Sequence, residues 1–141
     1  MALSREEREQ FLAEPHVGAL AVDAGPGRAP LTVPIWYQYT PGGDLWILTG
    51  RASRKAVLIA AAGRFSLMAD RLTPTIRYVS VEGPVTSTVP ATREKLVEIS
   101  ARYLPAEKVD AYVDFAWEAH GEQVVITMRP AHWLSSDLGG S

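Results

Sequence analysis

The sequence of 141 residues contains no cysteine. This absence excludes disulfide bonds, thiolate metal ligands and cysteine nucleophiles. Long apolar runs are also missing, because the longest one near an expected helix, residues 56–62, is far too short to cross a bilayer. The N-terminal segment 1–9 is too charged to form the apolar core of a secretory signal. We therefore expect a cytoplasmic protein without a membrane-spanning segment.

An excess of either charge is lacking as well. The formal net charge is −2, so no overall field draws the chain to nucleic acid or to an anionic membrane. Hydrophobic residues make up 47% of the chain, which is ordinary for a globular protein and too many for a disordered one. A chain of this length predicts one domain, residues 1–141, with one core.

Recognisable metal and hydrolase motifs are absent. His16, His120 and His132 do not stand at metal-ligand spacing, so we expect no metal site. There is no Gly-x-Ser-x-Gly elbow, and the glycine-rich loop 25–27 joins two strands instead of opening a helix. The residues alone therefore identify no catalytic group.

Alternating apolar residues and turn signals predict a mainly β protein. Ser4 and Glu7 form a capping box that begins a first helix, and further helices are expected over 53–62 and around 96–103 and 109–117. Strands are expected at 17–22, 31–39, 45–49, 65–69, 76–88 and 123–128. Gly83 and Pro84 predict a bulge or bend in the fifth strand. Since strands and helices do not alternate, we expect a six-stranded antiparallel barrel with peripheral helices.

Pro34 stands inside the apolar strand 31–39. A proline removes one donor from the ladder, which favours an edge strand, a bulge or a place where a ligand meets the backbone. The edge strand is the simplest of these interpretations, and Trp36 would ordinarily be a core residue.

The segment Thr49–Lys55 carries the strongest functional signal. A strand ends at Thr49, and Ser53 is placed to cap a new helix. Arg51, Arg54 and Lys55 surround the start of that helix, where the helix dipole disfavours cations. The alternative is a solvated basic turn, but cations beside unsatisfied N–H groups are better explained by a bound phosphate or carboxylate.

Three motifs, in this order and spacing, resemble a known family. They are Pro30-Leu-Thr-Val-Pro34-Ile-Trp36-Tyr, Leu48-Thr-Gly-Arg51-x-Ser53-Arg-Lys55 and Arg77-Tyr-Val-Ser-Val-Glu82-Gly83-Pro. The sequence is similar to the pyridoxamine 5′-phosphate oxidase-like split barrels, and within them to the B class of flavin/deazaflavin oxidoreductases of actinobacteria. The closing segment 130–138 is also similar to the end of such chains. The resemblance implies a homodimer with a tricyclic cofactor in a groove at the subunit boundary.

The resemblance also implies which residues bind the cofactor. Ser53 and Lys55 would hold its phosphate, Arg51 and Arg54 would assist, and Thr49 would lie at the edge of the pocket. The ring would lie along the backbone of Val33, Pro34, Ile35 and Trp36. The chain departs from many relatives at 58–64, where an Asn and an Asp-Pro-Arg step are replaced and Arg64 is retained.

The activity implied is hydride transfer from the reduced deazaflavin F420 to a small unsaturated or quinone-like substrate. FMN is the alternative cofactor on the same fold. Two further alternatives are a non-catalytic flavin or deazaflavin carrier and a haem-handling split barrel with His132 as ligand. Tyr78, His132 and solvent are all open as the second proton source.

Overall fold

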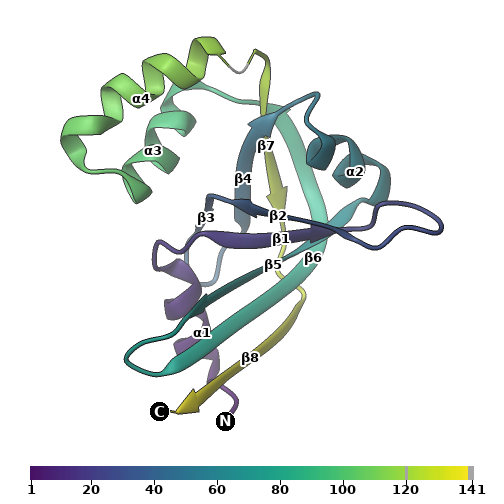
Figure 1. The fold of residues 1–141 in the computed structure, drawn as a ribbon, viewed down its shortest axis with the longest axis vertical. Coiled ribbons are helices and arrows are strands. Elements are labelled where there is room, and N and C mark those ends of the chain that lie inside the picture. Colours follow the sequence, from purple (N-terminus) through teal and green to yellow (C-terminus); the bar gives the residue numbers. More distant parts are fainter. Residues whose placement is uncertain (120, 140–141) are drawn as a thin grey trace.

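The computed structural model describes residues 1–119 and 121–139, which form one curled antiparallel sheet with helices around it (Figure 1). The helices in that part of the chain are α1 (Arg5–Ala13), α2 (Arg54–Ala62), α3 (Arg93–Tyr103) and α4 (Ala106–Ala119). The strands are β1 (Gly18–Val22), β2 (Leu31–Ile35), β3 (Tyr37–Tyr39), β4 (Leu45–Gly50), β5 (Arg64–Arg71), β6 (Ile76–Pro90), β7 (Gln123–Met128) and β8 (His132–Gly139). All six expected strands are present, so the mainly β architecture is confirmed.

The long strand β6 joins the two halves of the sheet. The strand order is β2-β1-β5-β6-β7-β4-β3, and β8 pairs with the free side of β6. The first part of β6 pairs with β5, and its last part pairs with β7 across a register shift between Val85 and Ser87. A Cβ at Gly83 would overlap the carbonyl oxygen of Arg129, so only glycine allows this approach. The bend expected at Gly83 and Pro84 is confirmed.

The expected strand 31–39 is interrupted at Trp36. β2 and β3 are the two outermost strands in the sheet order, and the chain passes from one to the other through this residue. The physical reason is a diverted donor, because the N–H of Tyr37 bonds the hydroxyl of Tyr103 at 3.1 Å. The inward alternation nevertheless continues across the break, and Tyr37 and Tyr39 are buried.

Residues 123–128 form the last strand that carries buried residues, but one more strand that the sequence did not predict follows them. This strand, β8, pairs with β6 from Glu82 to Ile76. Apolar and polar residues do not alternate clearly in β8, because two apolar residues stand side by side. Trp133 packs against the core, whereas Leu134 is 65% exposed. The apolar alternation that reveals a strand is therefore hidden in β8.

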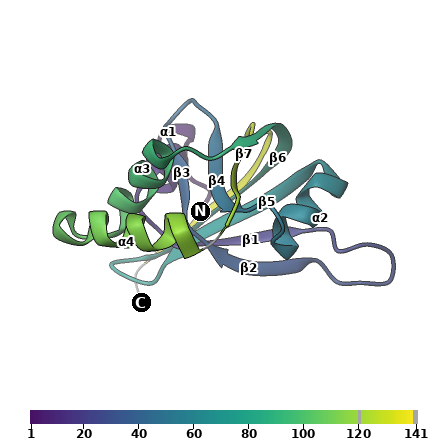
Figure 2. The same cartoon turned by 90° about the horizontal axis from the view of Figure 1, so that it is seen from above.

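Two apolar clusters hold the helices in place. Phe11 and Leu12 of α1 and Ile59 of α2 join the core inside the curled sheet. The α3–α4 pair packs its own cluster against Trp46 and Val125, on strands β4 and β7. Seen from above, α2 and the α3–α4 pair lie on opposite sides of β4 and β7 (Figure 2). Among the described helices, none has the length and apolar character needed to cross a membrane.

Three donors converge on the carboxylate of Asp137 in β8. The backbone N–H of Gly139, the hydroxyl of Thr75 and Nε of Arg77 each lie 2.8 Å from its oxygens. These contacts, led by the Gly139 hydrogen bond, lower the pKa of Asp137 to about 2. The carboxylate thereby ties β8 to the start of β6.

Asp137 therefore makes the stability of the fold depend on pH. Its pKa is depressed in the folded state, so its contribution is present above the unfolded pKa, about 4, and is lost as the pH falls toward 2. An Asp137→Asn variant should be less stable than the wild type at neutral pH, and this difference should shrink between about pH 4 and pH 2. Denaturant unfolding at each pH measures it, with Asp110→Asn on the exposed face of α4 as the control. A constant difference across that range would contradict the assignment.

Candidate functional site

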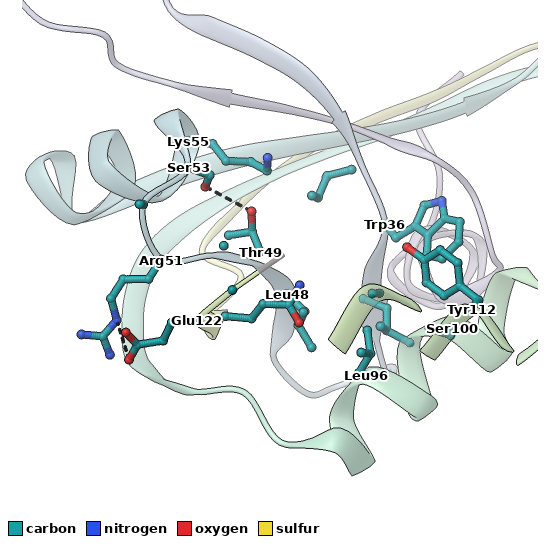
Figure 3. A pocket seen from close by; sticks show the side chains of 17 residues that line it. Trp36, Leu48, Thr49, Arg51, Ser53, Lys55, Leu96, Ser100, Tyr112 and Glu122 are labelled. Carbon is teal, nitrogen blue, oxygen red and sulfur yellow. Dashed lines mark hydrogen bonds and ion pairs between the residues drawn. The ribbon is translucent and has the colours of Figure 1, made fainter. Parts of the chain in front are cut away.

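A cleft of about 750 Å³ lies between the start of α2 and the α3–α4 pair (Figure 3). Its floor is β4, which carries Leu48 and Thr49, and Ile35 and Trp36 enter it from the break between β2 and β3. Its other lining residues are Gly50, Arg51, Ala52, Ser53, Lys55, Leu96, Ile99, Ser100, Tyr112, Ala116, Gly121, Glu122 and Gln123. A cleft of this size accommodates a cofactor or a small organic ligand.

The turn from Thr49 into α2 is built by hydroxyl groups. Ser53 caps the helix and accepts from the N–H of Ala56 at 3.3 Å, and its Oγ lies 3.2 Å from the hydroxyl of Thr49. Thr49 is only 6% exposed, so its hydroxyl holds the Ser53 side chain from the buried side of the turn. The helix ends at Gly63 with φ 74°, which confirms the expected span 53–62. The N–H groups of Arg54 and Lys55 have no intrahelical acceptor and are available to an anion.

The charges around this helix start fall into two kinds. Among the described helices, α2 alone has no acidic residue in its first turn. Lys55 is half-buried and lines the cleft, and it has no hydrogen bond or ion pair to the described residues. Its ammonium points into the space between α2 and Trp36 (Figure 3).

Arg51, by contrast, already has a partner. Its Nε lies 3.3 Å from Oε1 of Glu122, and the two side chains are 56% and 64% exposed. Exposed pairs of this kind are weak and screened by water, so a ligand can compete for Arg51. The sequence does not reveal Glu122, because it follows α4 and is remote from Arg51 along the chain.

An aromatic wall faces the basic turn across the cleft. Trp36 stacks on Tyr103 with ring centroids 4.8 Å apart and an interplanar angle of 13°, and Tyr112 lies 5.6 Å away at 41°. The Tyr103 hydroxyl accepts from Tyr37 N–H and donates to the carbonyl of His16 at 2.8 Å. These bonds fix the indole beside the cleft, where a flat conjugated ring can stack.

The wall formed by α3 and α4 is the part that sequence reasoning missed. Leu96, Ile99 and Tyr103 show that α3 has an apolar face, but periodicity does not say which strand it covers. One signal was available, because Ser100 is a polar residue on that same face.

The structure brings together six of the nine expected binding residues, which are Ile35, Trp36, Thr49, Arg51, Ser53 and Lys55. Val33 and Pro34 instead line a separate hollow of about 310 Å³ with residues of β1 and β5. Arg54 is exposed and lines neither cavity, so its assistance stays a prediction. The edge-strand interpretation of Pro34 is confirmed, because β2 ends the sheet order.

The residues proposed as proton donors, and His132 as the alternative haem ligand, lie outside the cleft. Tyr78 in β6 and His132 in β8 do not line the cleft. Within residues 1–119 and 121–139 there is no group of three or more His, Asp or Glu side chains able to hold a metal ion. His120 lies outside the described residues.

Comparison with known proteins places the chain among flavin-type oxidoreductase folds. The family model described as pyridoxamine 5′-phosphate oxidase matches residues 4–137. An F420 reductase is 25% identical with a TM-score of 0.68, covering 89% of this chain and 94% of that one. A conserved hypothetical protein from Mycobacterium tuberculosis is also 25% identical, with a TM-score of 0.72 and coverages of 97% and 86%. A FAD-binding protein from Mesorhizobium loti is 20% identical, with a TM-score of 0.69 and coverages of 99% and 98%. No curated protein matches the chain.

The two kinds of charge predict an order of effects on binding of a phosphorylated cofactor, F420 or FMN. Lys55→Ala removes an unpaired, half-buried ammonium and should weaken binding about tenfold or more. Arg51→Ala should cost less, because Glu122 already shares that charge, and Arg54→Ala should cost least. Isothermal titration measures the affinities, with Arg28→Ala in the β1–β2 loop as the control for loss of one positive charge. Unchanged affinity in both the Lys55 and the Arg51 variant would rule out the anion site.

Proposed function

This chain belongs to the pyridoxamine 5′-phosphate oxidase family, and on that premise we propose that it is an F420-dependent oxidoreductase. It transfers hydride from reduced F420 to a small unsaturated or quinone-like substrate. The observation that carries this proposal is the cleft itself, which sets an unpaired Lys55 beside the start of α2 and an aromatic wall opposite.

The donors at the start of α2 fit the phosphate of such a cofactor. The Ser53 hydroxyl, the Lys55 ammonium and the two free N–H groups at the start of α2 are all hydrogen-bond donors, and no carboxylate stands in the first turn to repel an anion. Ile35 and Trp36 would orient the ring from the edge of the sheet. β2 offers unpaired backbone groups on its outer side, because it pairs only with β1.

The choice of F420 over FMN rests on what lies beyond the phosphate. F420 continues into an anionic polyglutamate tail, whereas FMN ends at its phosphate. Arg51 and Arg54 are both exposed where the chain turns into α2, and there they would meet such a tail. The 25% identity to an F420 reductase supports the same choice.

The bound deazaflavin supplies the hydride, and the protein supplies position and shielding. Ser53 and Lys55 would hold one end of the cofactor while Ile35 and Trp36 align the other, which favours a near-attack geometry. Residues of α3 and α4 form the opposite wall of the cleft, where they would shield the reacting face from water. No side chain is assigned as the proton donor.

A side-by-side titration with F420 and FMN tests the cofactor. Of the four tryptophans, Trp36 alone lines the cleft, so binding of F420 should quench its fluorescence. Trp36→Phe should lose most of that quenching, whereas Trp117→Phe on α4 should retain it. Tight binding of FMN without binding of F420 would establish the FMN alternative and contradict the proposal.

We further propose that the protein acts as a homodimer through the outward face of its sheet. One row of residues crosses five strands in register, and it consists of Pro34, Ala19, Met68, Ser80 and Leu134. The row carries no charge, and none of its five residues belongs to the two apolar clusters against which the described helices pack. An uncharged row on an open sheet face can pack against the same row of a second copy about a two-fold axis. The hollow at Val33 and Pro34 opens on the same face, which would bring that part of the expected ring site to the subunit boundary.

A charge placed in this row should separate the subunits. Met68→Glu and Leu134→Glu should each convert a particle of twice the chain mass into a monomer, measured by light scattering after gel filtration. Val89→Glu, at an exposed apolar position near the far end of β6, should leave the dimer intact. A monomeric wild type, or a dimer that survives both row substitutions, would contradict the proposed interface.

A further inference from the structure

Two buried polar atoms in the cleft have no partner. Ser100 Oγ and Gln123 Oε1 are inaccessible to solvent and make no hydrogen bond within residues 1–119 and 121–139. Arg8 Nε is the third such atom among the described residues, and it lies outside the cleft. The unsatisfied side chains therefore gather in the cavity that the cofactor would use.

Ser100 is the stronger of the two observations. It is 0% exposed and lies on α3, near Leu96 and Tyr112 on the cleft wall (Figure 3). An alanine would suit these apolar neighbours better, because a buried hydroxyl without a partner loses its bonds to water and regains none. Native structures keep few such groups, and each calls for a ligand or an ordered water.

Gln123 approaches the same cleft from another element. It begins β7, opposite Gly50 in the sheet, and so stands near the basic turn. Ser100 and Gln123 thus line two different walls of the cleft.

We propose that Ser100, with Gln123, is a specificity-determining contact of this cleft for a planar conjugated ring that carries a carbonyl oxygen. The Ser100 hydroxyl donates to that oxygen once the side chains that cover it move aside, and the Gln123 amide bonds a second polar group of the same ligand. This inference rests on the proposed function for the identity of the ring, which is either the cofactor or the quinone-like substrate.

Ser100→Ala separates a ligand contact from a structural one. If the hydroxyl has no partner until a ligand binds, removing it should leave the unfolding temperature unchanged or raise it by about 2–4 °C. The same substitution should weaken ligand binding about tenfold. Ser100→Cys, which keeps the shape with a weaker donor, should fall between the two. Ser87→Ala, at an exposed serine of β6, is the control for loss of a hydroxyl outside the cleft.

Binding of two ligands shows whether Ser100 contacts the ring of the cofactor or the ring of the substrate. The affinities of F420 and of the quinone menadione are measured separately by quenching of Trp36 in each variant. A tenfold loss for F420 alone assigns the contact to the cofactor, and a loss for menadione alone assigns it to the substrate. Gln123→Met should weaken the same ligand.

The remaining outcomes overturn the inference or the proposed function separately. A lower unfolding temperature for Ser100→Ala, with both affinities unchanged, means that the hydroxyl is satisfied inside the protein and overturns the inference. If F420 binds tightly and Ser100→Ala changes neither its affinity nor that of menadione, the inference is overturned and the proposed function stays intact. If the wild type binds menadione but not F420, and Ser100→Ala weakens menadione binding, the inference is supported and the proposed function is overturned. A wild type that binds neither ligand overturns both.

Discussion

The hydrogen bond between the N–H of Tyr37 and the hydroxyl of Tyr103 holds the structure at the point where its curled sheet closes. β2 and β3 form the two ends of the sheet, yet only Trp36 separates them along the chain. Arg102, the residue before Tyr103, donates to the carbonyls of Ala13 and Glu14 at 2.6 and 2.7 Å. The end of α3 is therefore tied both to the sheet and to the end of α1. The position of Trp36, and with it the aromatic wall of the cleft, follows from these contacts.

The cleft divides recognition between its two sides. The start of α2 offers donors and positive charge without a carboxylate in its first turn, an arrangement that the helix dipole disfavours until an anion binds. The opposite side offers stacked aromatic rings and apolar residues of α3 and α4. A ligand that fits both sides has a phosphate at one end and a flat ring at the other. Both F420 and FMN carry a flat ring and a phosphate, and the exposed side chains of Arg51 and Arg54 are among the features that favour the longer molecule.

Local signals in the sequence predicted the local parts of the site. Ser53 and Gly63 mark the two ends of α2 by capping alone, and Gly83 marks the bend of β6 by its lack of a side chain. The missed features depend on residues that are far apart in sequence. The break at Trp36 requires Tyr103, the neutralisation of Arg51 requires Glu122, and the second wall of the cleft requires two helices whose periodicity does not reveal their neighbours. β8 was missed for a different reason, because its adjacent apolar residues, the exposed Leu134 and the partly buried Trp133, obscure the alternation that identifies a strand.

The central claim is that one cofactor spans the cleft from the start of α2 to Trp36. A crystal structure of the protein grown with F420 tests it most directly. The account predicts electron density for the phosphate within hydrogen-bond distance of Ser53 and Lys55, and for the ring against Ile35 and Trp36. Density that placed the phosphate out of reach of both Ser53 and Lys55 would contradict it.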